Sequence, residues 1–218
     1  MRYTTLLFDL DGTLTDPAEG ITNAVAYSLR GLGFSVPPYV ALLRFIGPPL
    51  LEAYRDFCGM SGEEALSALA LFREYYTERG ITENRLMPGA QEMLSRLSAC
   101  GICLAVASSK PEEQVHRVLS DFKIAHFFSV AVGSTPDQSR VKKADMIACA
   151  LRAIGNPEPS TCLMVGDRSY DVIGARACGV DTLGVLCGYG GREELLAVGA
   201  IALAEDLPCV ADFVLSHV

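Results

Sequence analysis

The sequence predicts an α/β fold, in which a three-layer core with a parallel β-sheet carries an inserted block of helices. Two features indicate this class. Short apolar segments that end in small or acidic residues alternate with segments of helical periodicity, which is typical of βαβ units. Residues 16–87, by contrast, contain helical patterns only. We therefore expect a core formed by residues 1–15 and 88–218 and a separate helical domain formed by residues 16–87.

The expected strands of the core are short and apolar. They cover Thr5–Leu10, Ile102–Ala107, Phe128–Val132, Cys162–Val165 and Thr182–Leu186, with a weaker sixth at Ala200–Ala204. The helices expected between them cover Ala90–Ser98, Pro111–Asp121, Lys143–Ile154 and Tyr170–Cys178. The last of these helices stops at Gly179, because glycine readily adopts the conformation that ends many helices.

The inserted block has clear helix start and stop signals. Asp16-Pro17-Ala18-Glu19 places an acidic N-cap and a first-turn proline before one helix, and Gly33 ends that helix. A second start at Ser61-Gly62-Glu63-Glu64 leads to Gly80, and Leu50–Phe57 forms a shorter helix between them. Open α/β sheets bind ligands at the carboxyl ends of their strands. We therefore expect this block to form a cap over those strand ends.

The composition narrows the classes of partner. The 218 residues include 18 basic and 26 acidic side chains, which is a formal charge of −8. Nucleic-acid polymers and anionic membranes are recognised by basic surfaces, so we expect neither as a partner. No apolar run reaches the roughly 18 residues of a membrane span, and the N-terminal apolar stretch is too short for a signal peptide. Eight cysteines without paired spacing indicate reduced thiols. We expect a cytoplasmic protein, either a monomer or a weak homodimer.

The most informative segment is Leu6–Thr13. An apolar strand delivers Asp9 and Asp11, and Gly12 then permits a sharp turn. An isolated Asp-x-Asp pattern often belongs to a solvent-exposed loop without a chemical role. Here the pattern stands at the end of a strand that is expected to be buried. Two carboxylates there are costly unless a cation neutralises them or one of them stays protonated. An acidic protein that binds an anionic substrate also needs positive charge in its site, and a divalent cation would supply it.

Polar residues also follow two further expected strands. Ser108-Ser109-Lys110 offers hydroxyl and amide groups to phosphate oxygens, although a plain strand-to-helix turn explains this segment equally well. Asp167 and Asp171 follow Cys162–Val165, where Asp167 also suits a simple helix N-cap. The carboxyl ends of parallel strands share one edge of the sheet. A single shared site therefore explains these coincidences better than separate local roles.

A lysine pair, Lys142-Lys143, begins one of the expected helices. The apolar face of that helix carries Ile147, Leu151 and Ile154, and Lys143 lies one helical turn before Ile147. Lys143 is therefore predicted to face the sheet, while Lys142 points away from it. A lysine in that position needs an anionic partner.

Together these motifs resemble those of the haloacid dehalogenase-like hydrolases, over the whole chain. Asp9-Leu10-Asp11-Gly12-Thr13 matches the first motif, Ser108 the second, Lys143 the third, and Gly166-Asp167 through Asp171 the fourth. Asp16, the Gly133-Ser134…Arg140 segment and Gly188-Tyr189-Gly190 make the chain most similar to the phosphoglycolate phosphatase branch. The resemblance implies a Rossmann-like core with an α-helical cap, and a phosphatase that acts on a small phosphorylated metabolite.

The resemblance also implies a role for each matched residue. Asp9 is the expected nucleophile, which forms an aspartyl-phosphate, and Asp11 is the expected acid/base, kept protonated in part by nearby negative charge. Mg²⁺ is expected to bind Asp9, the backbone carbonyl of Asp11, and Asp167. Lys143 and Ser108, together with the Ser109 amide, are expected to bind the phosphoryl group. Gly12 and Asp171 are expected to support the site.

The sequence departs from the family pattern at two places. Ser109 stands where the second motif usually has asparagine, which changes one hydrogen bond. In the helical block, the residues expected to set substrate specificity are Arg44, Gly47, Pro48 and Pro49. This Gly-Pro-Pro-Leu stretch differs from the glycine-richer loop of dedicated phosphoglycolate phosphatases. It looks more like the corresponding stretch in relatives that are assigned as nucleotidases or general phosphatases.

Phosphoglycolate-phosphatase-like hydrolysis is therefore the expected activity, and alternatives stay open. A 5'-nucleotidase or a broad-specificity phosphatase would use the same residues. A β-phosphoglucomutase-like phosphomutase is disfavoured, because two prolines occupy the loop that carries an anchoring arginine in such enzymes. Phosphonate-cleaving relatives need a cap lysine, and residues 16–87 contain none. A non-catalytic binding protein is disfavoured because every motif residue named above is present.

Overall fold

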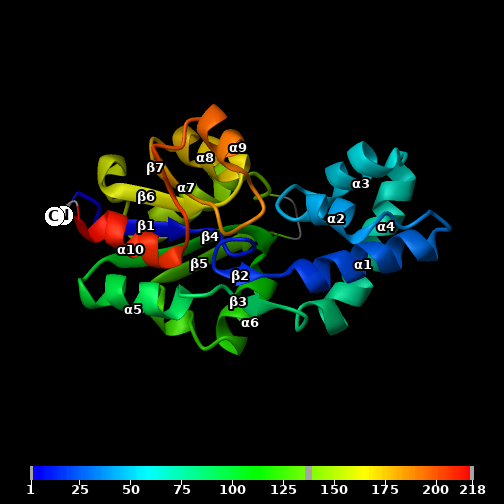
Figure 1. The fold of residues 1–218 in the computed structure, drawn as a ribbon, viewed down its shortest axis with the longest axis horizontal. Coiled ribbons are helices and arrows are strands. Elements are labelled where there is room, and N and C mark those ends of the chain that lie inside the picture. Colours follow the sequence, from blue (N-terminus) through cyan, green and yellow to red (C-terminus); the bar gives the residue numbers. More distant parts are fainter. Residues whose placement is uncertain (1, 136–138, 217–218) are drawn as a thin grey trace. The chain divides into compact units, whose positions relative to one another are not determined.

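The computed structural model describes residues 2–135 and 139–216. The chain divides into two compact units (Figure 1). One unit comprises Met1–Thr15 and Leu86–Val218, and the other comprises Asp16–Arg85. That the helical unit serves as a cap for the first stays a prediction.

The first unit contains a six-stranded sheet in which all neighbouring strands are parallel. The strand order is β5-β4-β1-β6-β7-β8. These strands are β1 (Thr5–Phe8), β4 (Cys103–Pro111), β5 (Val130–Ser134), β6 (Cys162–Gly166), β7 (Asp181–Val185) and β8 (Ala202–Ala204). The chain progresses outward from β1 through β4 and β5 on one side and through β6, β7 and β8 on the other. The order therefore reverses at β1, and such a switch point is where open α/β sheets bind ligands.

Helices cover both faces of this sheet. They are α5 (Ala90–Ala99), α6 (Glu112–Asp121), α7 (Lys143–Ala153), α8 (Ser169–Ala177), α9 (Arg192–Ala197) and α10 (Leu207–Ser216). Figure 1 shows α7 and α8 on one side of the sheet and α5 and α10 on the other. The predicted three-layer parallel core is confirmed.

The core of this unit follows from the apolar patterns in the sequence. All four residues of β1 are buried, as expected for a central parallel strand that is covered on both faces. On α7, Met146, Ile147, Ala150 and Leu151 are buried at helical spacing and pack toward the sheet. Burial of each large aliphatic side chain stabilises the fold by about 1.5–3 kcal/mol. This packing places the first residue of α7 beside the sheet edge.

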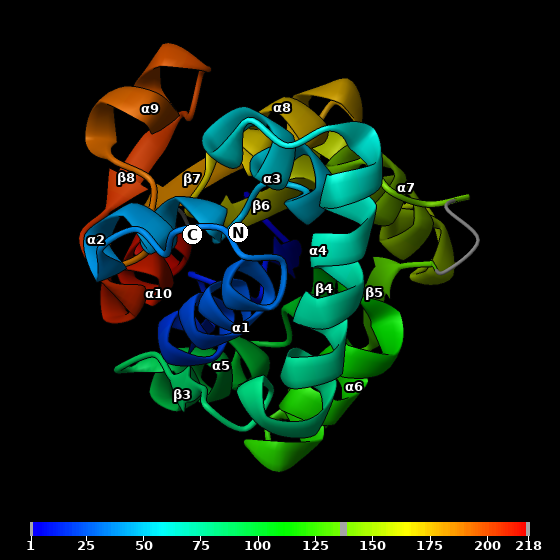
Figure 2. The ribbon, with the colours of Figure 1, turned by 90° about the vertical axis from the view of Figure 1, so that its right-hand side faces the viewer.

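The second unit is helical. It contains α1 (Ala18–Gly31), α2 (Tyr39–Leu42), α3 (Leu50–Cys58) and α4 (Gly62–Tyr75), followed by one π-helical turn at Tyr76–Gly80. The predicted start of α4 is a complete capping box, since Ser61 and Glu64 each accept a backbone hydrogen bond from the other. Figure 2 shows α1 running beside α4, and these two helices form the main contact within the unit.

The structure corrects several expected boundaries. β4 extends to Pro111, so Ser108 and Lys110 belong to the end of a strand and not to a turn. The block predicted to lack strands has two short ones at its edges, β2 (Thr15–Asp16) and β3 (Arg85–Leu86), which pair with each other. The helices α2, α9 and α10 and the 3₁₀ turns Leu43–Phe45, Ala125–Phe127 and Pro159–Thr161 were not predicted. Apart from α10, which has ten residues, these elements are short, and short elements depend on tertiary packing more than on local periodicity.

Two expectations about the whole chain can be compared with the structure. Each of the eight cysteines is a free thiol. Within residues 2–135 and 139–216, no helix combines the length and the apolar composition needed to cross a bilayer.

Candidate active site

The turn after β1 delivers the first two aspartates of the site. Asp9 follows the last residue of β1, and its backbone N–H donates to the carbonyl of Val165 on β6 at 3.0 Å. Gly12 then adopts φ +87°, a conformation that costs little only for glycine. This allows its N–H to donate to Thr15 O at 2.8 Å and closes a tight loop. Asp9 and Asp11 are thereby held by backbone geometry at the carboxyl end of the central strand.

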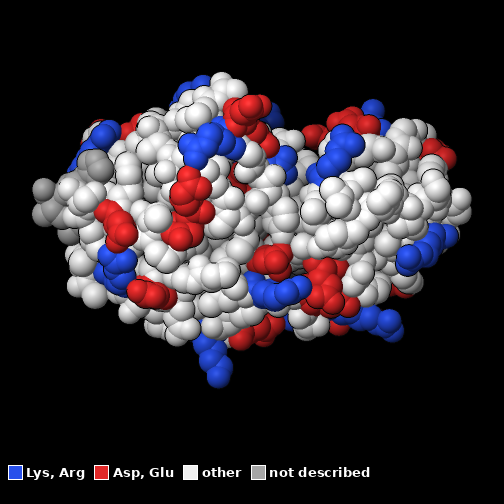
Figure 3. Space-filling model, in the orientation of Figure 1, with Lys and Arg blue, Asp and Glu red and all other residues white. Residues whose placement is uncertain are grey.

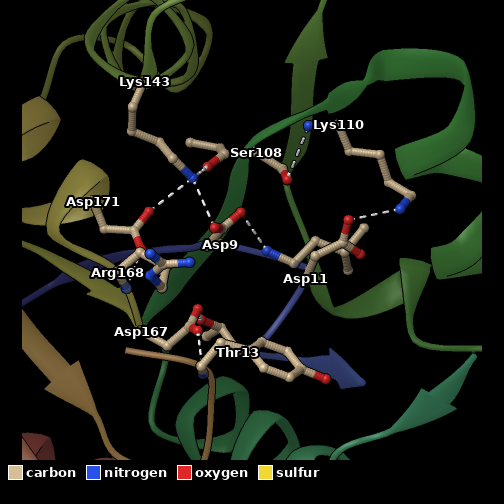
Figure 4. A network of polar contacts seen from close by, with 12 residues as sticks. Asp9, Asp11, Thr13, Ser108, Lys110, Lys143, Asp167, Arg168 and Asp171 are labelled. Atoms are coloured by element: carbon tan, nitrogen blue, oxygen red, sulfur yellow. Dashed lines mark hydrogen bonds and ion pairs between the residues drawn. The ribbon is translucent and has the colours of Figure 1, made fainter. Parts of the chain in front are cut away.

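One buried lysine joins two of the aspartates (Figure 4). Lys143 Nζ lies 2.9 Å from Asp9 Oδ2 and 2.8 Å from Asp171 Oδ1. It also donates to the carbonyl of Ala107, in the middle of β4, at 3.1 Å. The other oxygen of Asp9 accepts the N–H of Leu10 at 2.7 Å. Residues from β4, α7, α8 and the turn after β1 therefore meet at a single ammonium group.

The helical register of α7 explains why Lys143 reaches this position. The Lys143 side chain is only 5% exposed, whereas Lys142 is exposed to solvent, as the spacing to Ile147 predicts. Gly174 on α8 makes room for the lysine stem. A Cβ atom at Gly174 would lie 2.7 Å from Lys143 Cγ. Two packed helices thus guide the side chain toward the carboxylates.

Asp167 is held by neutral donors. Thr13 Oγ1 donates to Asp167 Oδ1 at 3.1 Å, and the backbone N–H of Tyr189 donates to Oδ2 at 2.8 Å. Two glycines surround the carboxylate closely. A Cβ atom at Gly12 or at Gly188 would lie 2.4 Å from Asp167 Oδ2. The carboxylate is fully buried in this cradle.

The electrostatics of the cluster are dominated by burial. Burial, then the charges of Asp171 and Asp9, raise the pKa of Asp167 to about 7, although its two hydrogen bonds act in the opposite direction. Burial also raises the pKa of Asp171 to about 6, with Lys143 opposing it. Burial lowers the pKa of Lys143, but Asp171 and Asp9 outweigh it and raise the pKa overall. The cluster therefore holds more negative charge than the Lys143 ammonium neutralises.

The residues present fit a hard divalent cation. Asp9, Asp167 and Asp171 each place a carboxylate oxygen within 4.8 Å of those of the others, and all three are buried. Carboxylate oxygens are the ligands that Mg²⁺ prefers in proteins. The expected ligand from Asp11 is its backbone carbonyl, and its side chain lies outside this group. A cation would offset the burial and the repulsion from Asp171 and Asp9 that raise the pKa of Asp167.

Lys110 is the functional candidate that the sequence analysis did not select. Its Nζ lies 2.7 Å from Asp11 Oδ2, and its side chain is only 4% exposed. Asp11 therefore contacts a cationic side chain directly through Oδ2. In the sequence, the sign of a functional role was that Lys110 directly follows Ser108-Ser109. The same position also fits a lysine at the start of a helix. Ser108 is buried beside it, and its Oγ lies 3.4 Å from the backbone nitrogen of Lys110.

Comparison with known proteins assigns this constellation to a family. The family model described as haloacid dehalogenase-like hydrolase matches residues 6–185 of the chain. The chain belongs to the haloacid dehalogenase-like hydrolases. The matched region contains Asp9, Lys143, Asp167 and Asp171, all of the helical unit and most of the unit that contains the sheet.

Several relatives of this hydrolase cover nearly its full length. A 5'-nucleotidase of Pseudomonas aeruginosa is 38% identical over 217 residues, which are 100% of this chain and 98% of that protein. A phosphoglycolate phosphatase of Vibrio vulnificus is 31% identical over 219 residues, 96% of this chain and 95% of that protein. The crystal structure of a predicted phosphatase from Clostridium acetobutylicum has a TM-score of 0.94 at 37% identity and covers 99% of this chain and 100% of that one.

One relative carries a name of a different kind. Tyrosine-protein kinase PtkA of Mycobacterium tuberculosis is 42% identical over 185 residues, which are 85% of this chain. The matched region spans 62% of the PtkA sequence.

The residues expected to set specificity lie in the helical unit of this hydrolase. The Arg44 guanidinium lies over the ring of Phe57, 4.1 Å from its centroid. Gly47 has φ +104°, and Pro49 directly precedes the first residue of α3. The segment is therefore braced from within its own unit by an aromatic contact and two consecutive prolines, Pro48 and Pro49.

The surface of this hydrolase carries mixed charge on the face drawn in Figure 3. On each unit taken by itself, the lysine and arginine side chains drawn there are interspersed with aspartate and glutamate. Polyanions such as nucleic acid bind to extended basic surfaces. Neither unit shows such an extended basic surface among its described residues on the side drawn in Figure 3.

Proposed function

We propose that the protein is a Mg²⁺-dependent phosphomonoester hydrolase that acts on a small phosphorylated metabolite through an aspartyl-phosphate on Asp9. The observation that carries this proposal is the position of the Asp9 carboxylate. It lies at the end of the central strand, 2.9 Å from a buried ammonium and grouped with Asp167 and Asp171. Membership of the hydrolase family supports it, as do full-length relatives named as phosphatases and as a nucleotidase.

The chemistry divides into two displacements. In the first, an Asp9 oxygen bonds to phosphorus, the ester P–O bond breaks, and Asp11 donates a proton to the departing alkoxide. In the second, Asp11 takes a proton from water, the water oxygen bonds to phosphorus, and the bond to Asp9 breaks. The products are an alcohol and inorganic phosphate, and both aspartates return to their starting states.

The surrounding residues hold the phosphoryl group. The Lys143 ammonium and the Ser108 hydroxyl, with the Ser109 amide, would donate to its oxygens, and Asp171 orients Lys143 through their 2.8 Å contact. Asp9, the Asp11 carbonyl and Asp167 would hold Mg²⁺. When bound, the metal would neutralise charge on the phosphoryl oxygens. Ser108 and Lys143 are buried, and the contacts of Lys143 with Asp9 and Asp171 hold its ammonium group in the site.

The test is a quenched reaction with excess substrate followed by peptide mass spectrometry. We expect a phosphate adduct on Asp9, no turnover after exhaustive EDTA treatment, and recovery on addition of Mg²⁺. Asp9→Asn removes the nucleophile and should abolish both adduct and turnover. Phosphate trapped on another residue, or full activity without divalent metal, would contradict the proposal.

For the substrate, we propose a compact phosphomonoester of the phosphoglycolate type, with a nucleoside 5'-monophosphate as the second candidate. The second candidate is supported by the full-length match to a 5'-nucleotidase and by the Gly47-Pro48-Pro49-Leu50 segment. A panel of phosphoglycolate, nucleoside monophosphates, sugar phosphates and pyrophosphate separates a specific enzyme from a broad-specificity phosphatase. The highest kcat/KM identifies the class.

Phosphoryl transfer to an acceptor other than water is a separate outcome of the same assay. A phosphomutase and a kinase both transfer a phosphoryl group to an acceptor other than water, and one relative of this chain is named as a tyrosine kinase. A hydrolase releases inorganic phosphate and alcohol in equal amounts. Alcohol release without matching phosphate would show transfer to another acceptor.

A further inference from the structure

Asp11 and Lys110 form an asymmetric pair in which the lysine is buried and the aspartate is partly buried (Figure 4). Lys110 Nζ donates to Asp11 Oδ2 at 2.7 Å, and the two side chains are 4% and 16% exposed. The other oxygen of Asp11, Oδ1, is buried and has no hydrogen-bond partner among the described residues. A buried carboxylate oxygen without a hydrogen-bond partner is costly unless the oxygen is used.

The end of β4 is shaped to aim Lys110. The register between β4 and β5 shifts between Ala107 and Pro111, and such irregularities re-aim side chains next to active sites. Gly133 on β5 permits the resulting close approach, because a Cβ atom there would lie 2.5 Å from Lys110 O. The Gly133 N–H also donates to Glu112 Oε2 at 3.1 Å, and Arg140 pairs with the same carboxylate. The segment that carries Lys110 is thus fastened to the neighbouring strand.

The chemistry of the ammonium decides which oxygen of Asp11 can carry a proton. A lysine ammonium has three donors and no acceptor, so the oxygen that it contacts must accept. A proton on Oδ2 would therefore oppose the Lys110 contact. A proton carried by Asp11 must reside on Oδ1, the oxygen without a partner.

We propose that Lys110 is a positioning residue for the acid/base Asp11. By holding Oδ2, it makes Oδ1 the oxygen that gives its proton to the leaving alkoxide and then takes one from water. This inference rests on the proposed phosphatase function, because it assigns the orientation of the acid/base in that reaction. Lys110 itself touches neither the substrate nor the metal in this scheme.

The leaving group provides the test. An alkyl phosphate needs a proton on its departing oxygen, whereas 2,4-dinitrophenyl phosphate does not. In Lys110→Met, kcat/KM for an alkyl phosphate should fall by about 10²-fold, the usual contribution of a placed general acid. The kcat/KM for 2,4-dinitrophenyl phosphate should fall by less than about threefold, because its leaving group departs without a proton. The later step, in which Asp11 acts as a base, does not affect this value, since kcat/KM reports only the steps up to phosphoenzyme formation. Equal losses on both substrates would overturn the proposal.

A double-mutant cycle with Asp11→Asn separates positioning from a general structural role. If Lys110 acts through Asp11, Lys110→Met should change kcat/KM by less than about threefold in the Asp11→Asn background. A further large loss in that background would refute the inference. The double variant removes both charges of the pair, so it remains informative even where Lys110→Met alone folds poorly.

Two controls complete the experiment. Lys142→Met removes an exposed lysine and should leave kcat/KM unchanged for both substrates. Wild-type protein is assayed first for the Asp9 adduct, because absence of that adduct would refute the proposed function itself. An Asp9 adduct with an unchanged leaving-group profile in Lys110→Met would refute only the role of Lys110.

Discussion

At the scale of single residues, the four aspartates of the site differ in the partner that each one meets. Asp9 and Asp171 share the Lys143 ammonium, and Asp11 contacts Lys110. Asp167 accepts hydrogen bonds from two neutral donors, the Thr13 hydroxyl and the backbone N–H of Tyr189. A buried carboxylate in such surroundings is the one that gains most from a bound cation. We therefore expect Asp167 to control both metal affinity and the stability of the metal-free protein.

Asp167→Asn should stabilise the metal-free protein. The asparagine oxygen can accept from the Tyr189 N–H, and its amide can donate to the Thr13 hydroxyl, so both contacts survive without the charge. The pKa of Asp167 is raised to about 7 in the folded protein, so its penalty is absent below pH ~4 and grows as the pH rises to about 7. We expect the variant to unfold at higher temperature than wild type at pH 8, with the difference vanishing near pH 4.

The same variant should lose its response to metal. Saturating Mg²⁺ at about 100 Kd stabilises a protein by about 2.7 kcal/mol, which differential scanning calorimetry resolves easily. Wild type should show this upward shift of Tm at pH 8, and Asp167→Asn should show little of it. A variant less stable than wild type without metal, or one with an undiminished Mg²⁺ shift, would contradict this account.

At the scale of secondary-structure elements, the site depends on helix register and on one tight loop. The register of α7 turns Lys143 toward the carboxylates and Lys142 toward solvent. The loop between β7 and α9 brings Tyr189 against Asp167, and it does so only because Gly188 lacks a side chain. For each of these two elements, a test variant can be compared with a control variant at a nearby residue.

Lys143→Met should reduce kcat by at least about 10²-fold, because it removes a preorganised donor to the phosphoryl group. It should also destabilise the metal-free protein by about 3–5 kcal/mol, since breaking a buried ion pair leaves its carboxylates uncompensated. Lys142→Met is the control on the adjacent residue, and both its kcat and its denaturation midpoint should match wild type. Comparable losses in the two variants would mean that the register assigned to α7 is wrong.

Gly188→Ala should weaken metal binding. The added methyl group would lie 2.3 Å from Gly12 O and 2.4 Å from the Asp167 carboxylate, so the loop or Asp167 must move. Gly191→Ala is the control in the same loop, because a Cβ atom at Gly191 meets nothing within 4 Å. We expect the Mg²⁺ concentration for half-maximal activity to rise by about 10–100-fold for Gly188→Ala, as for other disturbed outer contacts of metal sites. Similar values for both variants would show that the loop does not position Asp167.

At the scale of the whole molecule, the residues for chemistry and those expected to select the substrate belong to different units. Asp9, Lys143 and Asp167 lie in the unit that contains the sheet, and Arg44–Pro49 lies in the helical unit. The helical segment is braced by the Arg44–Phe57 contact and by two prolines that restrict its backbone. Its shape is therefore largely set before a substrate arrives.

If the helical unit selects the substrate, replacing Pro48 and Pro49 together with glycine should change the order of substrates. Loosening the loop raises the ordering cost of binding most for the substrate that fits the braced shape best. We expect kcat/KM ratios between phosphate esters to change by at least about threefold, while the Asp9 adduct still forms. An equal proportional loss for every ester would show that the segment does not discriminate.

Much of this protein is determined by the sequence alone. Alternating apolar and helical segments predict the parallel α/β core, and acidic or hydroxyl residues at the ends of Thr5–Leu10, Ile102–Ala107 and Cys162–Val165 predict a shared site. The spacing from Lys143 to Ile147 predicts which lysine is buried. Each of these predictions depends on residues close together in the chain, where periodicity and strand order are sufficient.

The tertiary structure alone decided which groups pair within the site. Lys110 and Asp11 are 99 positions apart, and Thr13 and Asp167 are 154 positions apart. Local sequence indicated a helix entry at Lys110 and a possible N-cap at Asp167. In the structure, the irregular end of β4 directs Lys110 to Asp11, and the close approach at Gly188 brings the Tyr189 N–H to Asp167. Such contacts depend on side-chain directions and on space between distant segments, which periodicity does not encode because it describes each segment by itself.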